Sequence, residues 1–126
     1  MQIKNGGVGK TTTALNLGVG LSKSGKKVLL VDADPQGDLT TCLGWRNQDE
    51  IEKTLGSVLE KVIKDIPLEE NEAILHHSEG VDLVPSNIDL ETIEVGLVNI
   101  MSREYVLKTY IDQVRNKYDC VIIDCR

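Results

Sequence analysis

Residues 4–12 read Lys-Asn-Gly-Gly-Val-Gly-Lys-Thr-Thr and lead directly into a helical pattern. Glycines at positions 6, 7 and 9 allow successive backbone N–H groups to turn inward on an anion, Lys10 adds a point charge, and Thr11 offers a hydroxyl for magnesium. This combination is typical of a phosphate-binding loop, which joins a central strand to a helix in α/β proteins. We therefore predict that phosphates bind at Gly6, Gly7, Val8, Gly9, Lys10, Thr11 and Thr12.

The loop departs by one residue from the common motif G-x-x-x-x-G-K-[ST]. The first glycine of that motif would fall at position 4, which is Lys4. A loop of this kind normally follows a full central strand. Only Met1–Ile3 precede this one, so we expect the start of that strand to be missing or replaced.

Composition favours a single soluble globular unit. The chain has 126 residues, of which 40% are hydrophobic and 27% charged, and its formal net charge is −6. There is no basic run, so these residues carry no electrostatic footprint for nucleic acid or an anionic membrane. Apolar runs stay well below the roughly 20 residues of a membrane span, and we expect a cytoplasmic protein with its three cysteines reduced.

Periodicity along the chain predicts strands that alternate with helices. Residues 11–24 repeat apolar side chains at helical spacing before Gly25, and residues 27–32 form an apolar run typical of a buried parallel strand. Helices are also expected over residues 51–62, 68–77, 86–100 and 103–116, and strands over 81–85 and 118–124. The fold class is therefore α/β, with a doubly wound, mostly parallel sheet.

Carboxylates follow two of the predicted strands. Asp32 and Asp34 end the first apolar run in the sequence D-A-D-P-Q-G, and Asp124 ends the last one, V-I-I-D. The carboxyl ends of parallel strands meet at one edge of the sheet, so these aspartates should lie near the phosphate-binding loop. An aspartate after an apolar strand is the Walker B pattern, in which the carboxylate holds magnesium largely through water.

The G-G-V-G-K-T-T loop, the D-A-D-P-Q-G element and the Y-D-C-V-I-I-D-C run at residues 118–125 together resemble the ParA/MinD family of deviant Walker A ATPases. The V-P-S-N-I-D-L run at residues 84–90 is a further similarity. This resemblance implies a sheet of the P-loop NTPase type with ATP and Mg2+ as cofactors. It also implies that residues 1–126 are the first half of such a domain, truncated at both ends.

The same resemblance assigns roles to individual residues. Lys10 would contact the β- and γ-phosphates and act in catalysis, Thr11 the magnesium ion, and Thr12 the α-phosphate. Asp124 would hold magnesium.

The D-A-D-P-Q-G element supplies the remaining two roles. Asp32 would help to order the magnesium shell, and Asp34 would orient or activate the attacking water. Both tasks suit phosphoryl transfer, in which positioning and charge neutralisation dominate.

One family feature is replaced in this sequence. The family carries a signature lysine just before the first glycine, which reaches the phosphates of the other subunit in a nucleotide-bound dimer. This chain has Asn5 there and Lys4 one residue earlier. A neutral amide would remove electrostatic stabilisation across the dimer, so nucleotide binding is better supported than efficient hydrolysis.

The resemblance favours a ParA-type chromosome or plasmid partitioning ATPase. It implies an ATP-dependent homodimer, a centromere-binding ParB-like partner, DNA contact only through regions outside these residues, and no membrane binding. Two alternatives stay open: a catalytically silent nucleotide-binding fragment or pseudo-enzyme, and an ATPase of the MinD-like or nitrogenase iron-protein-like type.

Overall fold

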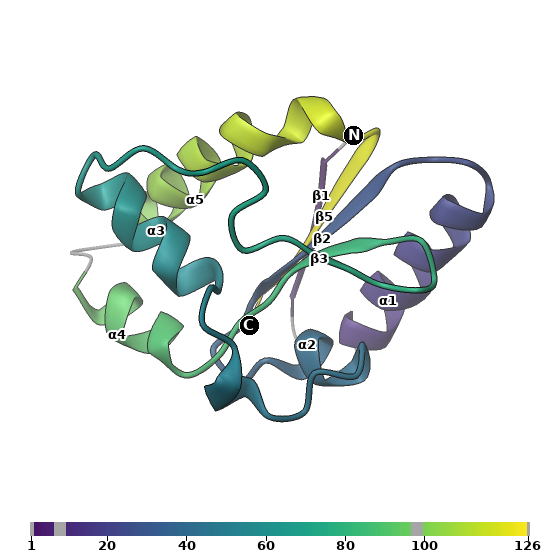
Figure 1. The fold of residues 1–126 in the computed structure, drawn as a ribbon, viewed down its shortest axis with the longest axis horizontal. Helices are drawn as coiled ribbons and strands as arrows, with labels where there is room; N and C mark the ends of the chain where they lie inside the picture. The colour runs from purple at the N-terminus through teal and green to yellow at the C-terminus, as the bar shows by residue number, and fades with distance from the viewer. Residues whose placement is uncertain (1, 7–9, 97–99, 126) are drawn as a thin grey trace.

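The computed structural model describes residues 2–6, 10–96 and 100–125, and its centre is a five-stranded sheet in the order β1-β5-β2-β4-β3 (Figure 1). The strands are β1 Gln2–Gly6, β2 Val28–Ala33, β3 Leu75–His76, β4 Asp82–Val84 and β5 Cys120–Cys125. Neighbours among β1, β5, β2 and β4 pair in parallel, and β3 pairs antiparallel to β4 at the sheet edge. The expected mostly parallel sheet is confirmed.

Helices cover both faces of this sheet (Figure 1). They are α1 Lys10–Lys23, α2 Asp38–Cys42, α3 Leu55–Ile63, α4 Asp89–Val95 and α5 Ile100–Val114, with 3-10 turns η1 Gln48–Glu50 and η2 Arg115–Lys117. None of the helices in the described ranges is long and apolar enough to cross a membrane.

The alternation of side chains along the strands creates two cores. Val28, Leu30 and Ile122 face α1 and α2, whereas Leu29 and Val121 face α3, α4 and α5. Strands β2 and β5 are buried at all but their last residue because helices pack on both sides, as the unbroken apolar runs predicted. The α1 helix lies especially close to the sheet, since a Cβ added at its Gly18 would come within 2.7 Å of Leu30.

Four predicted elements need correction. Residues 68–77 form turns and β3 instead of a helix, because Asn71 and Ala73 adopt left-handed backbone angles and the chain then pairs with β4. The helix expected over residues 86–100 is α4, which spans Asp89–Val95. The helix expected over residues 103–116 is α5, which begins earlier, at Ile100. The helix expected from residue 51 begins at Leu55.

The strand before the phosphate-binding loop is also longer than expected. It takes in Lys4, Asn5 and Gly6, which pair with Ile123, Asp124 and Cys125 of β5.

Cys42 lies at the end of the short α2 helix. His76 lies on β3, and His77 follows it.

Candidate functional site

The carboxyl ends of β2 and β5 bring two aspartates together. Asp32 and Asp124 are direct partners in the β2–β5 register, and both are buried, with exposed fractions of 0% and 3%. They lie two positions after Leu30 and Ile122 along their strands, so they share the face of the sheet covered by α1 and α2. The expected convergence of these two residues is observed.

Asp124 is joined to the first turn of α1. The Thr11 hydroxyl donates a hydrogen bond of 2.7 Å to Asp124 Oδ2. The hydroxyl proton points at the carboxylate, which leaves the lone pairs of the oxygen available to a cation. A hydroxyl and a carboxylate oxygen in contact are the hard donors that magnesium prefers, and magnesium completes its shell with water and phosphate oxygens. Thr11 and Asp124 therefore fit a magnesium ion.

Asp32 is held inside the protein. Its Oδ2 accepts hydrogen bonds from the backbone N–H of Thr40 at 2.9 Å and the Thr40 hydroxyl at 2.7 Å, and its Oδ1 accepts one from the Asp34 N–H at 3.2 Å. The Thr40 hydroxyl in turn accepts a hydrogen bond of 3.0 Å from the Ser86 N–H. Asp32 thus ties β2 to α2 and to the turn after β4.

The D-P-Q-G turn carries Asp34 at the same edge. Asp34 is half-buried, its Oδ1 accepts a hydrogen bond of 3.0 Å from the Gln36 N–H, and its carbonyl accepts one of 2.9 Å from Gly37. Gly37 has φ of +68°, which suits glycine. The Gln48 side chain donates hydrogen bonds to Gly37 O at 3.0 Å and Thr41 Oγ1 at 2.7 Å, which fixes the turn from outside.

Burial shapes the acid–base properties of this edge. Loss of hydration raises the pKa of Asp32 to about 6, although the Thr40 and Asp34 hydrogen bonds oppose the shift. Burial also raises the pKa of Asp124, opposed by the Thr11 hydrogen bond and reinforced by the nearby charges of Asp34 and Asp38. The edge is therefore an acidic site that a cation would relieve.

The remaining predicted residues surround this edge. Lys10 is the first residue of α1 and is exposed, as is Thr12 in the same turn. The N–H groups of this turn lack partners within the helix, which makes the amino end of α1 a suitable place for phosphate. Gly6 ends β1 opposite Cys125, and the predicted binding residues Gly7, Val8 and Gly9 lie outside the described residues.

Thr40, Ser86 and Gln48 contribute to the site but were not predicted. Each acts through a bond to a residue 8 to 46 positions away, and neither composition nor periodicity signals such a contact. The only available hint is the position of Thr40 shortly after the D-P-Q-G element.

Comparison with known proteins agrees with this geometry. The family AAA_31, described as "AAA domain", matches residues 1–126. The chain belongs to this family. It is 40% identical to the sporulation initiation inhibitor protein Soj of Bacillus subtilis over 126 residues, covering 97% of this chain and 46% of Soj. It is also 41% identical to the chromosome partitioning protein ParA of Myxococcus xanthus over 124 residues, covering 97% of this chain and 41% of ParA.

A solved structure shares the AAA_31 chain's fold over almost its whole length. Cobyrinic acid a,c-diamide synthase from Mycobacterium smegmatis, with bound ATP analog and magnesium, has a TM-score of 0.80 and 37% identity, covering 99% of this chain and 51% of that one. The chain thus spans about half the length of its relatives or less. The predicted resemblance to the ParA/MinD family and the P-loop fold are confirmed.

Proposed function

We propose that this AAA_31 chain forms the nucleotide-binding part of a ParA-type partitioning ATPase that binds Mg-ATP and hydrolyses it. The observation that carries the proposal is the Thr11–Asp124 hydrogen bond, which joins the amino end of α1 to the end of β5. That contact unites a phosphate-binding element with an acidic magnesium ligand. The names of Soj and ParA and the ATP analog bound to a structural relative support the same reading.

The residues divide the work at this edge. Backbone N–H groups of the loop and of α1, together with Lys10, hold the phosphates, and Thr11 and Asp124 hold magnesium. Magnesium, when bound, neutralises charge on the phosphate oxygens.

Asp34 lies at the turn where it can accept a hydrogen bond from an attacking water and align it. Asp32 does not face solvent, and its three hydrogen bonds hold the turn and α2 in place. Its contribution to the magnesium shell is therefore to position other groups.

The whole protein acts as an ATP-dependent homodimer in the cytoplasm, in this proposal, with a ParB-like partner and with DNA contacts outside residues 1–126. A net charge of −6 on this part supports the placement of DNA contacts elsewhere.

Asn5 favours a second candidate, a nucleotide-binding protein without turnover. It pairs with Asp124 in the register of β1 and β5, so the signature position lies beside the magnesium ligand. An amide there lacks the charge that stabilises phosphate oxygens in the transition state.

Binding and turnover of Mg-ATP by the full-length protein separate the two candidates. The proposed ATPase predicts saturable binding and steady release of phosphate, with Asp34→Asn binding ATP but losing turnover and Lys10→Ala losing affinity. Tight binding without phosphate release, together with a gain of turnover in Asn5→Lys, would support the silent protein. Absence of binding in the folded wild type would exclude both.

A further inference from the structure

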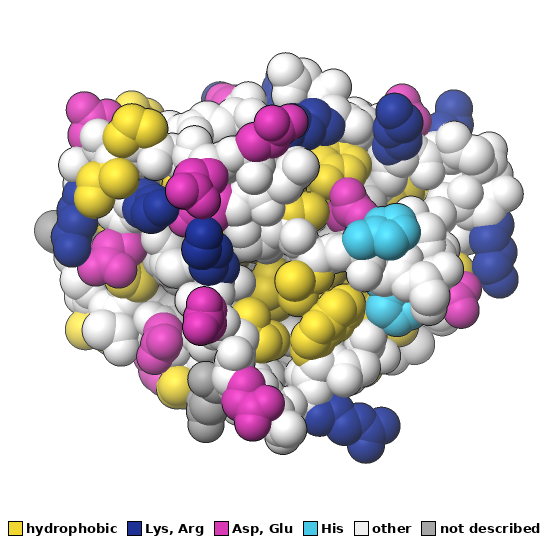
Figure 2. All heavy atoms as spheres, in the orientation of Figure 1, with side chains coloured by type: hydrophobic (Ala, Val, Ile, Leu, Met, Phe, Trp, Pro, Cys, Tyr) yellow, Lys and Arg dark blue, Asp and Glu magenta, His cyan; other side chains and the backbone are white. Residues whose placement is uncertain are grey.

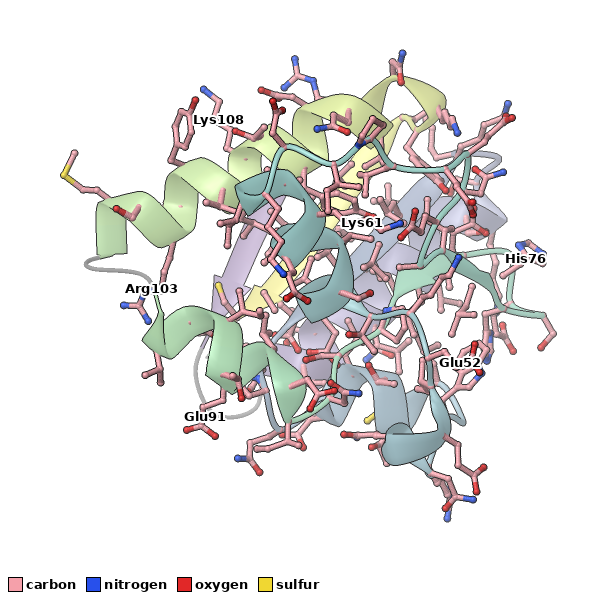
Figure 3. All side chains as sticks on the ribbon, turned by 60° about the vertical axis from the view of Figure 1, so that its left-hand side comes forward. Glu52, Lys61, His76, Glu91, Arg103 and Lys108 are labelled. Atoms are coloured by element: carbon pink, nitrogen blue, oxygen red, sulfur yellow. The ribbon has the colours of Figure 1, made fainter. Side chains whose placement is uncertain are left out.

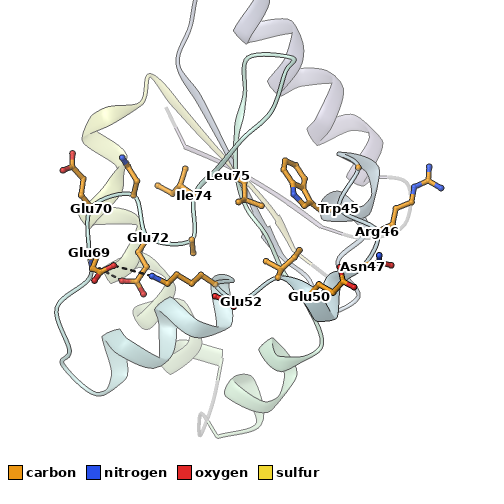
Figure 4. Close-up of a pocket in the computed structure, with 15 residues that line it drawn as sticks. Trp45, Arg46, Asn47, Glu50, Glu52, Glu69, Glu70, Glu72, Ile74 and Leu75 are labelled. Carbon is orange, nitrogen blue, oxygen red and sulfur yellow. Dashed lines mark hydrogen bonds and ion pairs between the residues drawn. The ribbon is translucent and has the colours of Figure 1, made fainter.

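A groove lies at the β3 edge of the sheet, away from β1. It has a volume of about 690 Å3 and runs between the segment 44–53, which follows α2, and the segment 69–75, which leads into β3 (Figure 4). Figure 2 shows hydrophobic side chains uncovered in a hollow of this face, with charged side chains around them. The groove uses none of the residues assigned to the nucleotide.

The floor of the groove is apolar. Trp45, Ile51, Ile74 and Leu75 line it, and each is only partly buried. Trp45 is the single tryptophan of the sequence, and the edge of its ring contacts His77 with centroids 6.0 Å apart. A rigid aromatic ring beside aliphatic side chains is the type of surface that accepts a large apolar side chain.

The rim of the groove is acidic. Of its glutamates, Glu72 is paired with Lys61 at 2.8 Å and Glu69 with Lys53 at 3.4 Å. Three more line the groove, are exposed and have no ion pair within the described parts of the chain: Glu50, Glu52 and Glu70. Against these three carboxylates stands Arg46, which also lines the groove and is exposed. The charge around the groove is thus mainly negative, which repels polyanions and attracts cations.

We propose that this groove docks a short basic segment of a protein partner, which places a large apolar side chain on Trp45 and its neighbours and lysine or arginine side chains at the glutamate rim. Charge complementarity requires the partner segment to be positively charged, and the apolar floor requires it to carry a large hydrophobic side chain as well. The proposal rests on the groove alone and not on the ATPase activity.

The groove is also connected to the nucleotide edge. Glu50 of η1 lines the groove, and Gln48 at the start of the same 3-10 turn donates a hydrogen bond of 3.0 Å to the Gly37 carbonyl of the D-P-Q-G turn. The 3-10 turn η1 therefore connects the groove with the turn that carries Asp34.

The test uses Trp45 fluorescence in the full-length protein, with Trp45→Phe to show that the signal comes from this residue. The probe is an acetylated and amidated Lys-Leu-Lys-Leu-Lys peptide, and the controls are Glu-Leu-Glu-Leu-Glu and Lys-Ser-Lys-Ser-Lys. We expect saturable binding of the first peptide alone, weakened by added salt because the rim is exposed.

Variants with matched charge locate the binding. Glu50→Gln/Glu52→Gln/Glu70→Gln should weaken the lysine–leucine peptide by about tenfold at low salt, the sum of three exposed ion pairs. The same substitutions at Glu60, Glu79 and Glu91, which do not line the groove, should leave affinity unchanged; Figure 3 shows Glu91 on α4, apart from Glu52. Thermal melts establish that both triple variants are folded.

Several results would overturn the proposal. Equal binding of the acidic and basic peptides would show that charge does not select the partner. An equal loss of peptide affinity in the two triple variants would show that the peptide binds outside the groove. Shielding of Trp45 from acrylamide in the peptide-free protein would mean that another part of the same chain fills the groove. Shielding that depends on protein concentration would mean that a second copy does so.

Discussion

Thr11 Oγ1 donates a hydrogen bond of 2.7 Å to Asp124 Oδ2, across 113 positions of sequence. The bond connects the helix that follows the phosphate-binding loop with the last strand of the described chain. Since the hydroxyl proton is directed at Asp124, its oxygen can accept a cation without rearrangement. In the proposed function, this contact preorganises two of the groups that would hold magnesium.

Replacement of Thr11 by valine should weaken magnesium-dependent nucleotide binding by roughly 10- to 100-fold, since the lost hydrogen bond involves a charged group. Valine has nearly the same shape, so the helix should persist. Thr11→Ser keeps the hydroxyl and should bind nearly as the wild type does. Titration of nucleotide at several magnesium concentrations measures the effect, and a valine variant with unchanged magnesium dependence contradicts the assignment.

Asp32 should make stability fall as the pH rises. Its folded pKa of about 6 lies above the ordinary value of 3.8, so the folded state binds the extra proton between these values. Stability from this group is therefore greatest below about pH 4 and is lost as the pH rises to about 6, by on the order of 3 kcal/mol at most.

Urea unfolding from pH 4 to 7, without nucleotide and with chelator, measures this contribution as the difference between the wild type and Asp32→Asn. In the asparagine variant, the free energy of unfolding should lack the decrease with rising pH that Asp32 causes in the wild type. Parallel pH profiles would contradict a raised pKa for Asp32.

Thr40→Val should destabilise the fold by about 2–4 kcal/mol. Its hydroxyl is the donor to Asp32 and the acceptor for Ser86, so valine leaves two buried polar groups each one hydrogen bond short. Thr40→Ser retains the hydroxyl and should recover most of the loss. Denaturant unfolding at pH 7 compares the two variants, and equal stabilities would show that the hydroxyl does not hold this network.

Glu72 should have the opposite pH dependence to Asp32. Its pKa is lowered, chiefly by the hydrogen bond from Lys61, and its side chain is only 2% exposed. The stability that it adds is present above its ordinary pKa and is lost as the pH falls through the folded pKa.

Glu72→Gln should therefore cost about 1–3 kcal/mol at pH 7, and the cost should shrink as the pH falls below the ordinary pKa of the carboxyl group. Unfolding measured at pH 7 and at a series of lower pH values tests this, with Glu60→Gln as an exposed control. A penalty for Glu72→Gln that does not shrink in acid would contradict the lowered pKa.

Sequence reasoning predicted the elements that local pattern determines. The strands β2 and β5 were recognisable because burial on two faces requires an unbroken run of apolar residues. The helices α1 and α5 were recognisable because burial on one face requires apolar residues at helical spacing. The meeting of Asp32 with Asp124 followed from the rule that parallel strands end at one edge. The exact hydrogen-bond partners did not follow from it.

The elements that were missed depend on distant contacts. β3 consists of two residues, and it exists because β4 supplies its partner, so its own sequence carries no strand signal. Thr40 is likewise unremarkable in sequence, and its importance comes from Ser86, 46 positions later. The groove required both segments 44–53 and 69–75 to be placed in space.

The paired burial of Asp32 and Asp124 has a thermodynamic consequence. Two carboxylates on adjacent strands, both with raised pKa, make the ligand-free edge costly to the fold. A ligand that brings a cation offsets this cost only in the folded state, so its binding free energy adds to the free energy of unfolding. The same residues that would serve the nucleotide therefore make the folded protein depend on its ligand for part of its stability.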